Sequence, residues 1–201
     1  MIARPSRRFI AMLLLSVAWA GAEGCAFAPS FSGTTVPSGI KPASLSRLYV
    51  YSFLDIRGNE LGSTMMNELS RQLAAELQTR GIATEQHWFK NDPIGAEFAR
   101  VRGTARIPVR EVIVRNQEAE RRFGSDYRLI AFPSNTVESG AWYSYDFQWV
   151  IEDTRTQRVV WSTTSHSKHM TWVSSNENAG ARARVIVNGL ISEMTRSGLL
   201  K

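Results

Sequence analysis

Residues 141–153 read AWYSYDFQWVIED, and this stretch decides the fold. Apolar and polar side chains alternate along it, which is typical of a β-strand with one face in a core. The polar residues 153–156 then predict a hairpin connection, and 157–170, QRVVWSTTSHSKHM, predict the partner strand. The predicted inner face comprises Tyr143, Tyr145, Phe147, Trp149 and Ile151, and the outer face Ser144, Asp146, Gln148 and Glu152.

An α/β unit precedes this hairpin. Residues 45–54 are apolar on both faces, which predicts a strand that is buried on both sides. Residues 82–89, IATEQHWF, predict a second strand. Between the two lies an amphipathic helix that ends at Gly81, a favourable residue for a helix C-terminus. The predicted apolar stripe of this helix is Leu61, Met65, Met66, Leu69, Leu73 and Leu77.

The middle of the chain is less regular. Residues 90–107 show no periodicity and predict a long loop. From 108 to 123 the pattern is helical, and Pro108 suits a first helical turn, although REVIVR (110–115) is also compatible with a strand. Residues 126–133, DYRLIAFP, predict a strand that enters the hairpin region.

The chain is predicted to end in a helix that begins near Ser175 or Asn176. The resulting order, β-α-β-(α)-β-β-β-α, predicts one α/β (α+β) domain over 45–201, a single mixed sheet with two or three helices packed on it. The expected buried stripe of the last helix is Ala179, Ala183, Ile186, Val187, Leu190, Ile191 and Met194, and its expected solvent face is Arg182, Asn188, Ser192 and Arg196.

Residues 1–24 have the features of a signal peptide. MIARPSRRF is basic, and residues 9–20 form an apolar run that is shorter than the roughly 20 residues of a membrane-spanning helix. Small residues follow the run, as before a cleavage site. Cys25 comes next and is the one cysteine of the chain, so an internal disulfide is excluded.

The tetrapeptide AEGC (22–25) resembles the lipobox of bacterial lipoproteins, which implies lipid attachment at Cys25. A non-aspartate residue after the cysteine, here Ala26, implies the outer membrane. Ordinary cleavage after Ala20 or Ala22 is the alternative and would release a soluble periplasmic protein. Residues 26–44 are rich in Pro, Ser, Gly and Thr, so that 25–44 are predicted to form the lipid-attachment site and a flexible tether.

The net charge is +6, and removal of residues 1–24 leaves 21 basic and 17 acidic residues, a net of +4. The bases are interleaved with acids, as in RNQEAERR (115–122), whereas nucleic-acid binders cluster them. We therefore expect no nucleic-acid partner. The expected partners are the membrane, through the N-terminal lipid, and another envelope protein.

The sequence contains weak candidates for a catalytic or metal site. His166 and His169 form H-x-x-H on a strand, where residues three apart point to opposite faces, so we expect exposed histidines and no metal site. His87 is expected to be structural. Trp142 and Trp172 fall outside the strand pattern and are candidates for a partner surface. Without a known catalytic motif, we expect neither an enzyme nor a cofactor.

Residues 45–200 resemble small Gram-negative envelope lipoproteins whose α/β domain is like the amino-terminal domain of TolB, including lipoprotein activators of penicillin-binding proteins. The strand and helix of 48–82, the GSDYRLIAFP strand, the hairpin from Asp153 to Trp161 and the closing helix carry this resemblance. It implies a non-catalytic, lipid-anchored accessory or assembly protein on the periplasmic side of the outer membrane. The alternative is a soluble periplasmic binding protein for a small apolar or anionic ligand.

Overall fold

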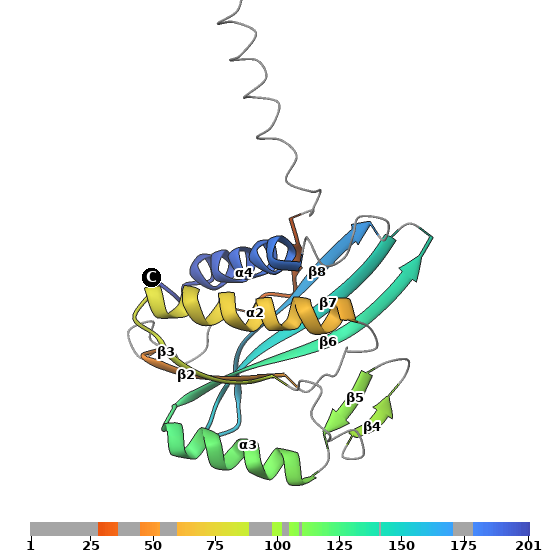
Figure 1. Cartoon of the computed structure of the whole chain (residues 1–201). Helices are drawn as coiled ribbons and strands as arrows, with labels where there is room; N and C mark the ends of the chain where they lie inside the picture. Colours follow the sequence, from red (N-terminus) through yellow and green to blue (C-terminus); the bar gives the residue numbers. More distant parts are fainter. Residues whose placement is uncertain are drawn as a thin grey trace, which may run out of the picture.

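A six-stranded mixed sheet forms the centre of the molecule, with the strand order β1-β8-β7-β6-β2-β3 (Figure 1). β2 runs parallel to β3 and to β6, and the other neighbours are antiparallel. The computed structural model describes residues 28–35, 45–52, 60–88, 98–101, 105–108, 110–140, 142–170 and 179–201. The sheet strands are β1 (Ser30–Ser32), β2 (Arg47–Ser52), β3 (Ala83–Trp88), β6 (Tyr127–Ser139), β7 (Trp142–Asp153) and β8 (Val159–Met170).

Helices cover both faces of this sheet. α2 (Glu60–Thr79) and α4 (Ala179–Arg196) lie side by side on one face, and α3 (Arg110–Phe123) lies on the other (Figure 1). This confirms the predicted mixed sheet with helices packed on it. Within the described ranges, no helix combines the length and the apolar character that crossing a membrane requires.

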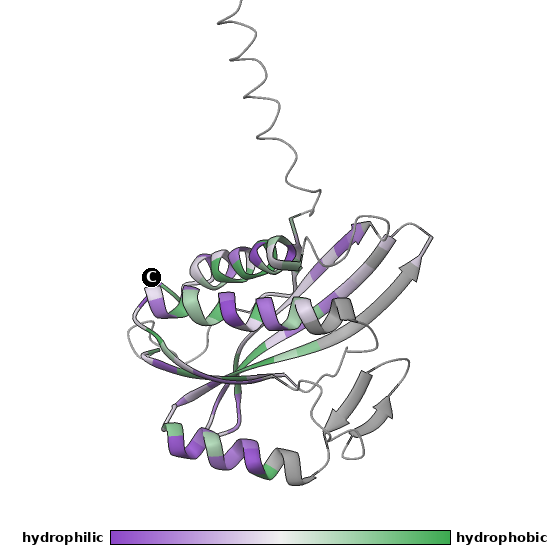
Figure 2. Ribbon diagram, in the orientation of Figure 1, coloured by the Kyte–Doolittle hydropathy of each residue, from purple (hydrophilic) through white to green (hydrophobic). Residues whose placement is uncertain are grey.

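The main core lies between the sheet and the pair α2 and α4. Trp149 and Trp161 are fully buried there, and each indole N–H donates a 2.9 Å hydrogen bond, to the Oγ of Ser165 and of Ser197 respectively. The buried indoles therefore leave no polar group without a partner. Residues of α2 and α4 supply much of this core, and Figure 2 shows hydrophobic residues along both helices, whereas the coloured part of α3 is mostly hydrophilic.

Most of the predicted elements are confirmed. α2 is followed by Gly81 at φ 74°, a left-handed conformation that glycine adopts without strain. β2 is buried on both faces, with Leu48 toward α2 and Tyr49 toward α3. Asp153 begins the β7–β8 turn, where its carboxylate accepts hydrogen bonds from the backbone N–H groups of Arg155 and Thr156.

The prediction of a loop over residues 90–107 is wrong in part. β4 (Phe98–Val101) and β5 (Ala105–Pro108) pair as an antiparallel two-stranded sheet. Pro108 therefore ends a strand and does not open α3. Four-residue strands are too short to show a period, which is why the sequence did not indicate them. β6 also continues beyond Pro133. Proline cannot donate a backbone hydrogen bond, and a shift in the strand register between Pro133 and Asn135 accommodates it.

Two solvent-face predictions are also wrong. Arg182 is buried in α4, since it lies one helical turn from both Ala179 and Ile186 at the margin of the apolar stripe. His169 is buried at the end of β8, on the same face as Trp161. The predicted start of the last helix near Ser175 or Asn176 lies outside the described residues.

The predicted tether is wrong for residues 28–35, which are part of the folded domain. β1 pairs antiparallel with β8, and the Thr35 N–H donates a 2.9 Å hydrogen bond to the Ser162 carbonyl. Thr34 hydrogen-bonds the hydroxyl of Thr163 at 2.7 Å and also donates to the Glu193 carboxylate. A strand of three residues is too short to show an alternating pattern. The prediction of a tether therefore rested on composition alone.

Gly189 in α4 allows β1 to pack closely. A methyl group placed on it would lie 2.7 Å from Cε2 of Phe31 and 3.0 Å from Cγ of Pro29. We expect Gly189→Ala to lower the free energy of unfolding by about 1–3 kcal/mol, because β1 must move outward. Urea unfolding of the unlipidated chain measures this loss.

Gly180→Ala is the matched control in the same helix. Its added methyl group would lie 3.5 Å from Oε2 of Glu68, an ordinary contact. This variant is expected to be as stable as the parent or more so, because alanine favours the helix by up to about 1 kcal/mol. Equal stability of the two alanine variants would contradict the close packing of β1 on α4.

Candidate functional site

A polar site lies between α3 and the sheet, on the face opposite the main core. Its base is a small apolar cluster of Tyr49, Tyr51, Ile130 and Val150, against which Phe123 of α3 packs. The guanidinium of Arg47 lies 5.0 Å from the centre of the Phe123 ring, in a cation–π contact. The short apolar stripe of α3 therefore docks on β2, β6 and β7 and carries polar residues to the rim of the cluster.

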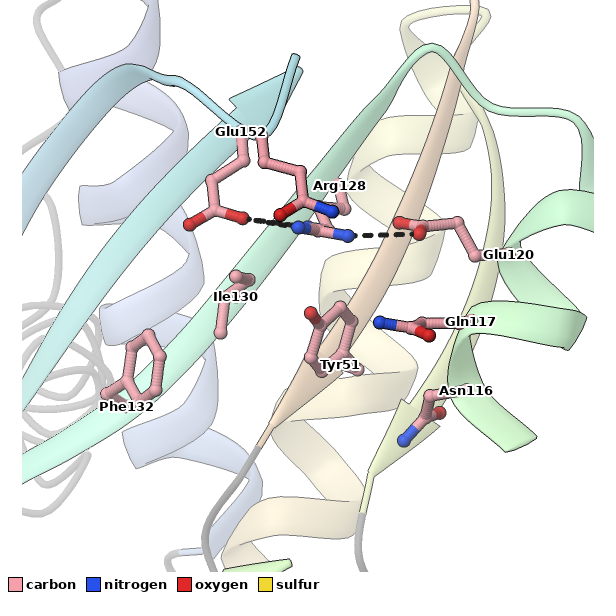
Figure 3. Close-up of a pocket in the computed structure, with 9 residues that line it drawn as sticks. Tyr51, Asn116, Gln117, Glu120, Arg128, Ile130, Phe132 and Glu152 are labelled. Carbon is pink, nitrogen blue, oxygen red and sulfur yellow. Dashed lines mark hydrogen bonds and ion pairs between the residues drawn. The ribbon is translucent and has the colours of Figure 1, made fainter. Parts of the chain in front are cut away.

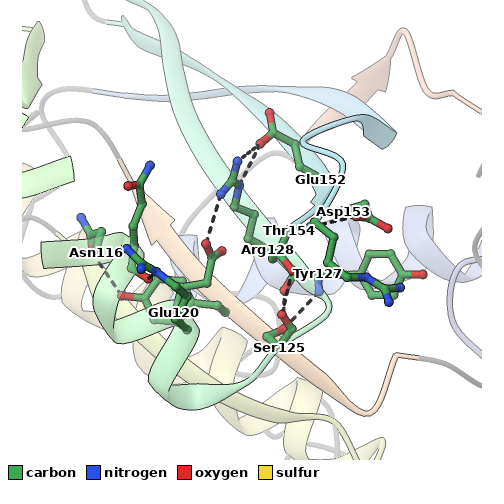
Figure 4. A network of polar contacts seen from close by, with 12 residues as sticks. Asn116, Glu120, Ser125, Tyr127, Arg128, Glu152, Asp153 and Thr154 are labelled. Carbon is green, nitrogen blue, oxygen red and sulfur yellow. Dashed lines mark hydrogen bonds and ion pairs between the residues drawn. The ribbon is translucent and has the colours of Figure 1, made fainter. Parts of the chain in front are cut away.

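A buried ion-pair network ties α3 to this face (Figure 4). Arg128 on β6 and Glu152 on β7 are direct cross-strand partners, with 2.8 Å between Nη2 and Oε2. Nη1 of Arg128 lies 3.1 Å from Oε2 of Glu120 on α3. The side chains of Arg128 and Glu120 are 10% and 8% exposed, so this pair is desolvated as well as charged.

Burial also shifts the acid–base properties of the site. It raises the pKa of Glu120 although the neighbouring Arg128 lowers it. It raises the pKa of Tyr49 to about 12, with the negative charges of Glu85 and Glu120 adding to the effect. Burial raises the pKa of Tyr51 as well. Both tyrosines therefore keep their hydroxyl protons at neutral pH.

A cavity of about 210 Å³ opens beside the network (Figure 3). Asn116 lies at its wall and accepts a 3.1 Å hydrogen bond from the Tyr49 hydroxyl through Oδ1, while its buried Nδ2 has no hydrogen-bond partner. Oε1 of Glu120 is likewise buried without a partner. Ile130 and Phe132 supply an apolar wall. The wall of the cavity thus contains one buried donor and one buried acceptor without hydrogen-bond partners, next to apolar surface.

These charges limit what the cavity binds. Two carboxylates and one guanidinium leave a net charge of −1 when all three are ionised, which favours a group that donates hydrogen bonds and disfavours an anion. The volume is below the roughly 300–1,000 Å³ of typical small-molecule sites. The geometry therefore suits a single polar or basic side chain of a partner better than a separate ligand.

The sequence did not identify this site. Arg128, Glu120 and Glu152 belong to three different elements, and Glu120 lies in a stretch of mixed charges that resembles an ordinary solvated helix face. The alternation of 141–153 placed Glu152 correctly on the face opposite Trp149, but it could not show that α3 covers this position. The signal that could have indicated the site is an arginine in the otherwise apolar strand YRLIAF (127–132).

The predicted candidates are distributed elsewhere. Cys25 and Trp172 lie outside the described residues. His166 and His169 point to opposite faces of β8 as expected, but only His166 is exposed. In the part of the chain that the structure describes, no group of three or more His, Cys, Asp or Glu is placed to hold a metal ion. Trp142 is half-buried at the start of β7.

Three polar residues on the outer face of the sheet also meet. Nε2 of His166 lies 2.7 Å from the Ser32 hydroxyl, and Nδ1 lies 3.0 Å from Oδ1 of Asp146. A hydroxyl, an imidazole and a carboxylate in this order form catalytic triads in hydrolases. Here they form a row across β1, β8 and β7, and the His166 side chain is 43% exposed. The row joins β1 to the sheet. Catalysis of acyl transfer relies on hydrogen-bond donors that stabilise negative charge in a site without water, and this position is open to water.

Comparison with known proteins finds solved structures that are remotely similar to this one. No family model and no curated protein matches the chain. Its structure is similar to a PelC dodecamer from Paraburkholderia phytofirmans, with 12% identity and a TM-score of 0.45 over 80% of this chain and 96% of that one. It is also similar to lipoprotein GNA1162 from Neisseria meningitidis, with 16% identity and a TM-score of 0.40 over 73% and 99%.

A third similar structure is a minor lipoprotein from Acinetobacter baumannii, with 15% identity and a TM-score of 0.34 over 76% of this chain and 91% of that one. Proteins of similar structure thus include bacterial lipoproteins. Likeness at these values says nothing about what this chain binds. The resemblance to the TolB amino-terminal domain in particular stays a prediction from the sequence.

Proposed function

We propose that this chain is a non-catalytic accessory or assembly protein of the bacterial cell envelope. A lipid on Cys25 holds it on the periplasmic side of the outer membrane, and it acts as an interaction module for another envelope protein. The observation that carries this proposal is the basic leader with its short apolar run, followed at once by the one cysteine of the chain.

The cavity beside α3 is the proposed contact point for the partner. Its net negative charge and its small volume of about 210 Å³ support a partner that inserts a basic or amide side chain. This particular cavity gives no support to the alternative of a soluble carrier. A carrier for an apolar or anionic ligand needs a larger and less acidic pocket.

Membrane fractionation of cells that produce the wild-type chain or Cys25→Ser tests the anchor. We expect the wild type in the outer-membrane fraction and Cys25→Ser in the soluble periplasm. Intact mass of the wild type should show an acylated chain that begins at residue 25. An unmodified chain that begins at residue 21 or 23 would contradict the anchor and favour the soluble alternative.

A photo-crosslinking amino acid tests the contact point. At Gln117, which is exposed and lines the cavity, it should give a discrete crosslinked product in cells. At Gln78, which is exposed on α2, it should not. The Gln117 product should disappear with Cys25→Ser. Equal crosslinking from both positions would contradict a specific site beside α3.

A hydrolase is the second candidate, because Ser32, His166 and Asp146 are arranged as in a triad. We expect no reaction of the chain with a fluorophosphonate probe, since the row is exposed to water and lies on an edge strand. Labelling of Ser32 that is lost in His166→Gln would contradict the non-catalytic proposal.

A further inference from the structure

The strand that follows the predicted anchor begins at one particular end of the sheet. Ser30 of β1 is paired with His166, four residues before the end of β8, and Ala28 lies nearer that end, where it lines one cavity with Lys168. At this same end Trp142 is paired with Met170 and with Ser139. The β6–β7 turn and the end of β8 therefore lie together, as Figure 1 shows. The β7–β8 turn, with Arg155, lies at the opposite end.

The distance from the anchor to this end is short. Three residue steps separate Cys25 from Ala28, the first residue that the structure describes. Whatever their conformation, they span at most about 11 Å, at up to 3.6 Å for each residue. β1 itself is held by β8 and by the packing of Phe31 on Gly189. A lipid on Cys25 therefore keeps this end of the sheet next to the bilayer.

The side chains at this end suit a lipid surface. Nζ of Lys168 lies 5.6 Å from the centre of the Trp142 ring. By the alternation of their strands, both residues lie on the face opposite the buried Trp149 and Trp161, which α2 and α4 leave uncovered. Lys168 is exposed and Trp142 is half-buried. Tryptophan is enriched at the level of lipid headgroups, and lysine is attracted to anionic lipid. The turn residues Ser139 and Gly140 are small, exposed and uncharged.

From the reach of the anchor and this chemistry, we propose that the end of the sheet formed by the β6–β7 turn, Trp142 and Lys168 rests in the headgroup region of an anionic bilayer. This contact gives the anchored domain a fixed orientation. The inference rests on the proposed acylation of Cys25, and it adds a second membrane contact that lipid attachment alone does not require.

Spin labelling of the full lipidated chain tests the contact. Because Cys25 would be acylated, a cysteine introduced at Ser139 or at Arg155 is the single free thiol for the label. Both positions are exposed, one at each end of the sheet. The labelled proteins are reconstituted into vesicles of phosphatidylethanolamine and phosphatidylglycerol, and collisions with oxygen and with a water-soluble nickel chelate are measured.

We expect the label at residue 139 to lose nickel collisions several-fold when the protein is on vesicles, and the label at residue 155 to be unaffected. Lys168→Glu should restore part of the nickel access at residue 139 without releasing the protein from the vesicles. Equal access at both positions on vesicles would overturn the proposed contact while leaving the anchor intact. Protection of residue 139 without vesicles would also overturn it, because the chain itself would then cover this end.

Failure of the protein to float with vesicles would overturn the contact and the proposed anchoring together. Flotation of the labelled chains therefore separates the two ideas: it reports the lipid on Cys25, whereas the nickel measurement reports the orientation of the domain.

Discussion

Arg128→Met is expected to lower the free energy of unfolding by about 3–5 kcal/mol, because the substitution leaves the buried carboxylate of Glu120 and the half-buried carboxylate of Glu152 without their shared cation. The loss should become smaller at acidic pH. Burial already raises the pKa of Glu120, so this carboxyl group takes up a proton readily once Arg128 is gone. Urea unfolding of the unlipidated chain at several pH values measures both effects.

Two controls identify the cause of this loss. Arg155→Met removes an exposed guanidinium that lies 3.9 Å from Asp126, and it should leave stability unchanged. Combining Arg128→Met with Glu120→Gln and Glu152→Gln removes the uncompensated charges and should recover much of the stability. If the triple variant were as unstable as Arg128→Met alone, lost packing and not buried charge would explain the effect.

Acidification from pH 6.5 to pH 4 is expected to remove on the order of 3 kcal/mol of stability through His169. Burial, together with the nearby charge of Arg182, lowers the pKa of His169 to about 4 in the folded chain, against 6.5 as the ordinary value. Between these pH values the unfolded chain binds a proton on this residue that the folded chain does not. Stability contributed by His169 is therefore fully present above pH 6.5 and is lost as the pH falls toward 4.

His169→Gln should abolish this dependence, and the difference between the stability curves of the two proteins isolates the histidine. Glu120, whose raised pKa acts in the opposite direction, is common to both proteins and cancels. His166→Gln is the matched control on the exposed face of the same strand and should leave the loss that is due to His169 in place. A parallel course of the wild-type and His169→Gln curves from pH 6.5 to 4 would contradict a buried neutral imidazole.

The elements with a strong period could be predicted from the sequence. The alternation in residues 141–153 identified β7 and its inner face, and Phe147, Trp149 and Ile151 are fully buried. The 3.6-residue period identified α2 and α4, whose predicted stripes are buried wherever the structure describes their side chains. These periods reflect burial along one continuous segment, so they are visible without knowledge of its neighbours.

The parts that depend on distant contacts could not be predicted. β1 owes its strand conformation to β8 and α4, and the Ser32 hydroxyl meets a histidine 134 residues away. Arg128 and Glu120 resemble ordinary solubility charges until α3 is placed on the sheet. Arg182 and His169 are polar residues that the local pattern assigns to solvent, but the packing of α4 on β8 buries them.

The place of β1 in the sheet has a consequence for the order in which the domain can fold. β1 is close to the start of the chain, but its partners β8 and α4 are the last elements to be synthesised. The edge position beside β8 cannot be filled until almost the whole polypeptide has emerged. Before that point β1 has no partner strand, so this edge of the sheet closes only after residues 159–196 have been made.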